Sequence, residues 1–186
     1  MLRTFTTKQL IFIALMAALL FVINFVVGEG IIVATGIPGS SGFVTGLTNL
    51  AVLTLIGLIF RRLGAITLLY LIYGFLAIPT HMAGGPPGAI WKIIPLIITA
   101  FVFDLPTWLF KYRKVGFIVG LPAFVIIGLV VYIGAYRLMG IPLDEFIHVL
   151  PWLIVAFTLL GYIGVWLGFV LYNRLKNKRM IRQIMN

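Results

Sequence analysis

Only a few residues of this chain have side chains that could do chemistry. The four acids and two histidines are Glu29, His81, Asp104, Asp144, Glu145 and His148. Two cations, Lys92 and Arg137, join this polar set because they stand apart from the clusters that hold the other lysines and arginines. An ionisable residue within an apolar chain is a candidate for a functional site by default. The polar set is therefore the first place to expect a binding or catalytic site.

The most irregular stretch of the sequence is PTHMAGGPPGAIWK, residues 79–92. Backbone so rich in glycine and proline is tolerated at membrane depth only where protein covers it or water reaches it. We therefore expect this stretch to line a binding site that includes His81, Trp91 and Lys92. The Lys92 ammonium either contacts a carboxylate or phosphate of a ligand or extends to lipid headgroups. Trp91 is likewise either a stacking surface or an interfacial anchor.

Glu29 and the two histidines are further candidates for ligand contact. Glu29, between two glycines, either accepts hydrogen bonds from a ligand, pairs with Lys92 or Arg137, or is an exposed loop carboxylate. His81 and His148 have no histidine four residues away, and the chain has no cysteine. We therefore expect these histidines to hydrogen-bond a ligand or lie at the interface, and we predict no metal site and no cofactor.

Asp104 lies within the apolar sequence FVFDLP. A buried carboxylate has to be paired or protonated. We expect Arg61, Arg62 or Lys111 to pair with it in a structural clamp. A proton-relay role for Asp104 would instead make the protein a secondary transporter.

Catalytic motifs are absent from the sequence. The chain has no G-x-S-x-G, no phosphate-cradling loop and no nucleotide motif. Ser40 and Ser41 with the distant His81 are the one arrangement that could mimic a hydrolase, and these serines fall in a predicted loop at the outer surface. We therefore expect a protein that is not an enzyme.

The composition indicates an all-α integral membrane protein. Hydrophobic residues make up 62% of the 186, charged residues 10%, and the mean hydropathy is +1.19, whereas a soluble domain is about half apolar and a quarter charged. The net charge of +10 does not indicate nucleic-acid binding, because basic residues in so apolar a chain usually fix its orientation. Residues 1–9 lead into an apolar run without a cleavage-site pattern, so we expect a first spanning helix and not a signal peptide.

The apolar runs predict one compact domain, residues 1–186, of six transmembrane helices. Each span needs roughly 20 apolar residues, and residues 28–42 are predicted to be a loop. The predicted spans are about 10–27, 43–60, 65–78, 89–110, 115–138 and 147–172. This order places 12 of the 14 basic residues on one side, leaving out only Lys92 and Arg137. The positive-inside rule then puts both termini in the cytoplasm.

Small residues recur four apart in several predicted spans. Examples are Ala14 with Ala18 in the first span and Gly164 with Gly168 in the sixth. Such spacing lets helices approach closely in lipid. Ala14 and Ala18 stand in an otherwise bulky helix, so we expect them either to dock on a partner or to pack inside the monomer.

In length, six-helix layout, cytoplasmic termini and the A-x-x-x-A sequence from Ala14 to Ala18, the chain resembles the S components of energy-coupling factor (ECF) vitamin transporters. These are the substrate-binding subunits of a class of prokaryotic ABC importers. The resemblance covers essentially the whole chain in layout and is specific in only a few residues. Residues 61–88, from RRLGAI to GGPPG, also look similar to the corresponding stretch of thiamine-precursor S components.

The resemblance implies a multi-pass plasma-membrane protein without an ATPase of its own. It would capture a water-soluble vitamin or vitamin precursor at an outward-facing site, gated by residues 28–42 and built with residues 79–88 and helices four to six. The first helix would dock through Ala14 and Ala18 on a transmembrane coupling subunit bound to two cytoplasmic ATPase subunits. The protein would then topple in the membrane to release its substrate. The expected partners are these subunits, the vitamin and membrane lipid, with no nucleic acid.

The charges leave the identity of the substrate open. Lys92 and Arg137 suit an anionic vitamin such as pantothenate. A cationic or pyrimidine-like vitamin would suit Glu29 with Trp91, Trp152 and His148. The similarity to thiamine-precursor proteins favours a thiamine-class ligand, and the energising module is either dedicated or shared. The alternative function is a standalone secondary transporter driven by an ion gradient, although the broken-helix inverted repeat of such folds is not visible in the sequence.

Overall fold

The apolar runs of the chain form helices, because a helix satisfies every backbone N–H and C=O within its own segment. A computed structural model describes residues 5–35, 41–80, 87–138 and 144–185. Within these ranges the chain is all-helical and has no strand. The elements are α1 (Thr7–Thr35), α2 (Ser41–Phe60), α3 (Ala65–Ala77), the 3₁₀ helix η1 (Ile90–Lys92), α4 (Ile93–Leu109), α5 (Lys114–Leu138), α6 (Asp144–Leu175) and α7 (Arg179–Met185).

Four helical segments are long and apolar enough to cross a membrane. They are Thr7–Gly28, Ile90–Leu109, Lys114–Val131 and Leu150–Leu175. The other two predicted spans are shorter apolar helices, Thr45–Phe60 and Ala65–Ala77. At a rise of 1.5 Å per residue, α3 is only about 20 Å long. The all-helical prediction is confirmed, and the count of six spans stays a prediction.

The first helix is longer than the sequence predicts. We expected it to end at Val27 and residues 28–42 to form a loop, whereas α1 continues to Thr35 and α2 already begins at Ser41. The two glycines at positions 28 and 30 each cost about 1 kcal/mol relative to alanine in a helix. That cost is small compared with the several kcal/mol that each unsatisfied backbone group of the following apolar residues would cost in lipid. The prediction of a long loop was therefore wrong for the described part of this segment.

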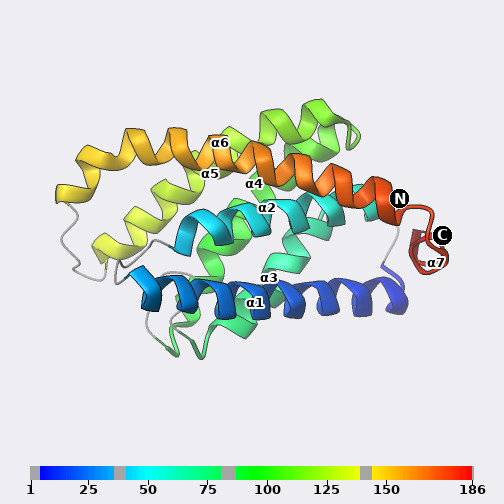
Figure 1. Ribbon diagram of the computed structural model, residues 1–186, viewed down its shortest axis with the longest axis horizontal. Coiled ribbons are helices and arrows are strands. Elements are labelled where there is room, and N and C mark those ends of the chain that lie inside the picture. The colour runs from blue at the N-terminus through cyan, green and yellow to red at the C-terminus, as the bar shows by residue number, and fades with distance from the viewer. Residues whose placement is uncertain (1–4, 36–40, 81–86, 139–143, 186) are drawn as a thin grey trace.

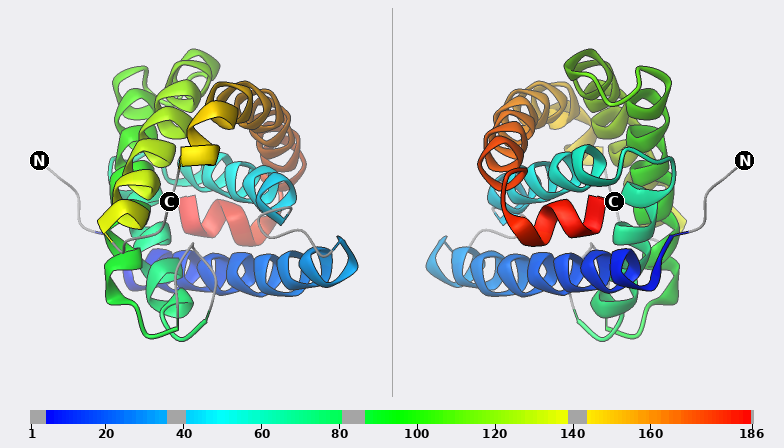
Figure 2. Two further views of the ribbon diagram at one scale, coloured as in Figure 1. Left: turned by 90° about the vertical axis from the view of Figure 1, so that its left-hand side faces the viewer. Right: turned by 90° about the vertical axis from the view of Figure 1, so that its right-hand side faces the viewer.

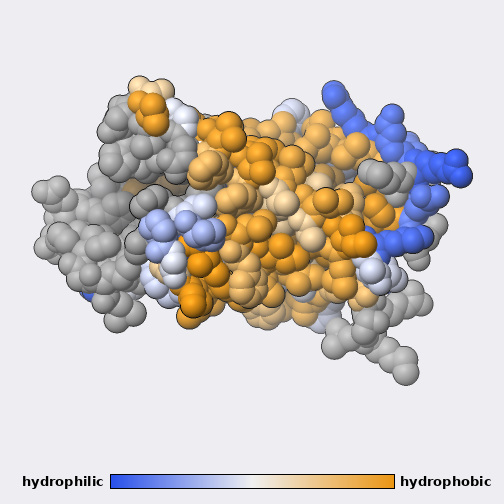
Figure 3. Space-filling view, turned by 90° about the horizontal axis from the view of Figure 1, so that it is seen from below, coloured by the Kyte–Doolittle hydropathy of each residue, from blue (hydrophilic) through white to orange (hydrophobic). Residues whose placement is uncertain are grey.

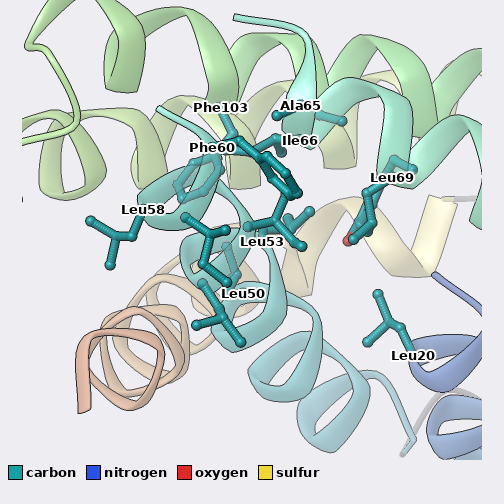
Figure 4. Close-up of a cluster of buried hydrophobic side chains, with 14 of the residues drawn as sticks. Leu20, Leu50, Leu53, Leu58, Phe60, Ala65, Ile66, Leu69 and Phe103 are labelled. Atoms are coloured by element: carbon teal, nitrogen blue, oxygen red, sulfur yellow. The ribbon is translucent and has the colours of Figure 1, made fainter. Parts of the chain in front are cut away.

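The helices pack in pairs around a common core. α2 packs most extensively against α6, α4 packs against α5 and α3, and α1 covers α2 and α3 (Figure 1). Side chains from α2, α3 and α4 converge in the core, among them Leu53, Ile66, Leu69 and Phe103 (Figure 4). The Phe103 ring meets the Phe117 ring edge-on at 5.9 Å between centroids. The core therefore lies where the two shorter helices meet the longer ones.

Glycines allow α6 to approach α2 closely. A Cβ at Gly164 would lie 2.7 Å from the Leu47 carbonyl oxygen, and a Cβ at Gly168 would lie 2.6 Å from Thr54 Cβ. Backbones come this close only where side chains are absent, as in the small-xxx-small contacts of membrane helices. The expectation that Gly164 and Gly168 mediate a helix contact is confirmed.

Most of the described basic residues gather at one end of the bundle, and Lys92 and Arg137 are the exceptions. Figure 3 shows strongly hydrophilic residues concentrated at this end and an apolar surface along the middle. Gln9 in α1 donates to the Ile184 carbonyl oxygen in α7 at 3.0 Å, and Arg62 donates to Gln9 Oε1 at 3.4 Å. Arg61 donates to the Tyr172 hydroxyl at 3.4 Å. These bonds bring the start of α1, the α2–α3 turn, the end of α6 and α7 together, and Figure 2 shows α7 lying across this end beside α1.

Candidate functional site

Four neutral polar side chains from α1, α2 and α3 meet inside the bundle. Asn24 is only 1% exposed. Its amide nitrogen donates to Asn49 Oδ1 at 2.6 Å and to the Tyr73 hydroxyl at 3.2 Å, and its amide oxygen accepts from the Thr48 hydroxyl at 2.9 Å. Both amide hydrogens and the carbonyl of Asn24 are thus used. We call Asn24, Thr48, Asn49 and Tyr73 the amide cluster.

The amide cluster lies in the half of the bundle away from the basic end. Asn24 comes 17 residues after Thr7, about 26 Å along α1. Asn49 lies in the first half of α2, and Tyr73 lies near the end of α3. Because α1 starts and α2 ends at the basic end, Asn24, Asn49 and Tyr73 all lie at the same level, past the middle of the bundle as counted from the basic end. The cluster and the basic end therefore lie in opposite halves.

Aromatic rings surround one side of the amide cluster. Tyr73 stacks on Tyr70 with 5.7 Å between centroids, and Phe21 meets Tyr73 edge-on at 6.4 Å. Tyr70 in turn meets Phe124 of α5 at 6.4 Å. Neutral donors and acceptors beside aromatic faces are what a site for a planar heterocyclic molecule requires. No described residue of the cluster is an acid or a base, so it suits binding and not proton transfer.

Asn49 and Tyr73 keep donors available within the amide cluster. Asn49 is half-buried, and its amide N–H groups donate no hydrogen bond within the described ranges. The Tyr73 hydroxyl accepts from Asn24 and likewise donates to no described residue. A buried amide normally finds partners for its hydrogens. These two groups are therefore the ones that could meet a ligand.

Lys92 is completely buried, with 0% exposure. Its ammonium donates to the Ala77 carbonyl oxygen at 3.4 Å and to the Thr80 carbonyl oxygen. Both acceptors belong to the C-terminal end of α3 and the turn after it, where carbonyls have no partner within the helix. One of our two expectations was that Lys92 extends to lipid headgroups at the surface, and this expectation was wrong. Contact between Lys92 and a ligand stays a prediction, and the observed contacts cap α3.

Asp104 also serves α3, at its other end. Its Oδ2 accepts from the backbone N–H of Gly64 at 2.7 Å, from the Thr67 N–H at 3.4 Å and from the Thr67 hydroxyl at 3.2 Å. Gly64 has a φ of 91°, a left-handed conformation that favours glycine, and this turn aims its N–H at the carboxylate. We expected a basic side chain as partner. The described hydrogen bonds come instead from the start of a helix, whose free N–H groups attract a carboxylate.

A second buried group lies beside Asp104. Asp104 Oδ1 and the Tyr112 hydroxyl are both buried and have no hydrogen-bond partner within the described ranges. Burial raises the pKa of Tyr112, and the Asp104 carboxylate raises it further. Tyr112 is therefore a neutral phenol, and it lies in the turn between α4 and α5 at the basic end. The two atoms form a small polar site without a completed hydrogen bond.

The remaining predicted site residues whose side chains the structure describes lie in three different elements, η1, α5 and α6. Trp91 is half-buried next to Lys92 in η1, while Arg137 and Trp152 are exposed, Trp152 to 77%. His81 lies outside the described residues. Glu29 and His148 lie in α1 and α6, but their side chains are outside the description. Among the described residues no group of histidines and acids could hold a metal ion.

Ala14 and Ala18 lie on the outward side of α1. Spacing of four residues places them in one row with Leu10 and Val22, which are 42% and 54% exposed. Both alanines are half-buried. The fully buried Ile13 and Ala17 each directly precede one of these alanines and so lie on the neighbouring face of the helix. The alanines therefore form a notch in an exposed apolar row, and docking on a partner stays a prediction.

Sequence reasoning missed the amide cluster. Asn24 and Asn49 each stand within a predicted span, at positions where a polar side chain is costly unless it is paired. That cost is the signal that could have found them. The charged residues gave the stronger signal in the sequence, whereas in the described structure these neutral amides take part in three side-chain hydrogen bonds.

Comparisons with known proteins found no matching family model, no matching curated protein and no matching solved structure. The functional proposal therefore rests on the chain's own residues and geometry.

Proposed function

We propose that this protein is the substrate-binding S component of an ECF-type ABC importer in a prokaryotic plasma membrane. In this proposal the protein crosses the membrane six times, with both termini in the cytoplasm. It captures a water-soluble vitamin or vitamin precursor from outside, and it delivers this substrate by toppling on a transmembrane coupling subunit that two ATPases energise. The protein itself performs no chemistry on the substrate.

The observation that carries the proposal is that two different faces of α1 hold two different kinds of site. One face of this helix holds Asn24 in the amide cluster, and the outward face holds the notch at Ala14 and Ala18. The notch lies nearer the basic end and the cluster lies nearer the opposite end. One rigid helix thus connects a ligand-type site to a surface suited to close helix packing. Such a connection is what a substrate-binding subunit without its own motor needs.

The distribution of charge supports the orientation. Exposed lysines and arginines concentrate at the end formed by the start of α1, the two helix turns and α7 (Figure 3). The positive-inside rule assigns that end to the cytoplasm. The amide cluster then falls in the outer half, where an importer receives its substrate. The short helix α3 has both of its ends inside the bundle, where the buried Asp104 and Lys92 hydrogen-bond them.

The chemistry of the amide cluster favours a neutral, ring-shaped recognition element on the substrate. Its groups are amides, a threonine hydroxyl and a phenol beside stacked aromatic rings. Lys92, the cation that would suit an anionic vitamin, already donates to two carbonyls of the chain. A pyrimidine-bearing vitamin of the thiamine class therefore fits better than pantothenate.

The test is binding by the purified protein. In detergent, thiamine, its pyrimidine precursor and a panel of other water-soluble vitamins are added singly, and the midpoint of thermal unfolding is measured. We expect one class of vitamin to raise the midpoint, since a ligand that binds only the folded state stabilises it. Mass spectrometry of small molecules carried through purification should identify the same class. If no vitamin raises the midpoint and no vitamin copurifies, the proposal fails.

The docking surface is tested separately from binding. Replacing Ala14 and Ala18 together by Trp should abolish ATP-dependent vitamin uptake by cells while purified protein still binds its vitamin. The control is Val130→Trp, which places the same bulky side chain at an exposed apolar position of α5, 60% exposed. Loss of binding in the double variant would show that the alanines pack inside the monomer.

The runner-up function is a standalone secondary transporter, and one observation favours it. Asp104 Oδ1 is buried without a hydrogen-bond partner among the described residues, as a proton-carrying carboxyl would be. This function predicts uptake by the protein alone in liposomes when a proton or sodium gradient is applied. Uptake that instead requires ATP and a coupling subunit would exclude it.

A further inference from the structure

A surface groove lies between α1 and α7 at the basic end of the bundle. Its volume is about 310 Å³, and it is open along one side. The residues that line it are Lys8, Ile11, Phe12, Leu15, Gln183 and Ile184. Figure 2 shows α7 lying across this end of the bundle beside α1. The groove is separate from the amide cluster, and neither Ala14 nor Ala18 lines it.

The groove is polar at one end and apolar along the rest. Lys8 stands one turn before Phe12 and two turns before Leu15, so α1 changes from a cation to apolar side chains over about 10 Å. On the α7 side, a polar residue and an apolar residue, Gln183 and Ile184, likewise line the groove next to each other. The Gln9 side chain donates to the Ile184 carbonyl oxygen, and Ile181 is buried, so α7 is held in place. These contacts place α7 as the second wall of the groove.

The charge around the polar end has one sign. Lys8 is exposed, and so are eight other basic residues of this end, namely Arg61, Lys111, Arg113, Lys114, Arg174, Lys176, Lys178 and Arg179. Of the four acids of the chain, Asp104 is buried inside the bundle, and Glu29, Asp144 and Glu145 lie toward the other ends of α1 and α6. A molecule bound here would meet a positive field without a compensating carboxylate on the surface.

We propose that this groove binds an anionic phospholipid. An acyl chain lies along Ile11, Leu15 and Ile184, and the phosphate lies at the Lys8 ammonium. A soluble phosphate would leave the apolar wall unfilled, and an uncharged acyl chain would leave the cation unused. Basic pockets between helices on the cytoplasmic side of membranes suit anionic headgroups. This site goes beyond the vitamin-binding function and does not depend on it.

The test uses the full-length protein, stripped of lipid in a neutral detergent. Phosphatidylglycerol and phosphatidylcholine with identical acyl chains are titrated separately, and native mass spectrometry counts the bound lipids. We expect one phosphatidylglycerol to bind more tightly than any phosphatidylcholine. Lys8→Gln should weaken that one site about fivefold, as the loss of one cation near a headgroup predicts. Lys178→Gln, which removes an exposed cation outside the groove, should leave it unchanged.

A second variant tests the apolar wall. Leu15→Trp fills the groove at an exposed position, so the fold should persist, and the site for phosphatidylglycerol should be lost. Equal binding of the two lipids, no effect of Lys8→Gln, or equal effects of the two lysine variants would each overturn the proposal. Full competition by glycerol phosphate would overturn it too, because a soluble anion would then suffice. Retained lipid binding in Leu15→Trp would show that the chain lies elsewhere and would equally refute it.

Discussion

Lys92 and Asp104, twelve residues apart around α4, hold the two opposite ends of the neighbouring helix α3. The Lys92 ammonium donates to the carbonyl oxygens of Ala77 and Thr80, and Asp104 Oδ2 accepts from the N–H groups of Gly64 and Thr67. Twelve residues of helix span about 18 Å, which matches the roughly 20 Å of α3. Each charge faces the end of the helix dipole that attracts it. The two buried ions thus brace a helix that has no side-chain cap of its own at Gly64 or Ile78.

Lys92→Met tests the brace at the C-terminal end of α3. Methionine keeps most of the side-chain volume and removes the three donors, so the carbonyls of Ala77 and Thr80 each lose a charged donor, while Ala77 keeps its bonds from the Thr80 N–H and hydroxyl. We expect the free energy of unfolding to fall by about 1–3 kcal/mol, which is several degrees in the midpoint of thermal unfolding. Lys178→Met, at an exposed lysine, should change little. If Lys92→Met abolishes vitamin binding without lowering the midpoint, Lys92 is a ligand contact and not a cap.

Asp104 is tested by two replacements of different kind. Asn keeps an oxygen for the Gly64 and Thr67 donors and removes the charge, so it should cost about 1 kcal/mol, whereas Leu removes the acceptor and should cost about 3 kcal/mol. Thermal unfolding of the purified variants measures this order. ATP-dependent uptake by Asp104→Asn should persist if the residue is structural. Uptake that becomes independent of an ion gradient in Asp104→Asn would instead support a secondary transporter.

The sequence predicted the helices well because long apolar runs have one way to satisfy their backbone. It also predicted correctly that the described basic turns share one end, since antiparallel neighbours bring alternate turns together. It failed at Gly28 and Gly30, where two glycines were read as a stop and the helix continues to Thr35. A glycine breaks a helix only where the chain beyond it gains more from another conformation.

The partners of the polar residues could not be predicted, for a different reason. Asp104 was assigned to a cation near in sequence, but its donors are backbone N–H groups at Gly64 and Thr67. Lys92 likewise bonds carbonyls, and every residue has one. Backbone donors and acceptors are invisible in a sequence until the ends of helices are placed side by side. The amide cluster depends in the same way on the register of α1, α2 and α3.

Tyr73→Phe tests whether the amide cluster binds substrate. The change deletes one hydroxyl, which removes an acceptor from Asn24 and one free donor. We expect the affinity for the vitamin found in the binding panel to fall about tenfold, which equals about 1.4 kcal/mol, and the thermal midpoint to fall by a few degrees. Tyr162→Phe is the matched control, because its hydroxyl donates to the Ile118 carbonyl on an exposed surface. A lower midpoint with unchanged affinity would make the cluster purely structural.

The glycines of α6 differ in what a methyl group would meet. At Gly168 it would lie 2.7 Å from the Ala51 carbonyl oxygen, and at Gly164 2.7 Å from that of Leu47. At Gly161 the nearest atom is the end of the flexible Leu121 side chain, also at 2.7 Å. Backbone atoms cannot move aside without separating the helices, whereas a leucine can change its rotamer. The same substitution should therefore have graded effects along one helix.

Alanine at each of these glycines gives the prediction its scale. Gly168→Ala and Gly164→Ala should each lower the free energy of unfolding by about 1–3 kcal/mol, the usual cost of overpacking, and Gly161→Ala should cost less. Gly134→Ala in α5 is the control, since nothing lies within 4 Å of its Cβ and alanine favours a helix by up to about 1 kcal/mol. Its thermal midpoint should stay the same or rise. Equal midpoints for all four variants would mean that α2 and α6 do not touch along Gly164 and Gly168, and the packing described for this pair would be wrong.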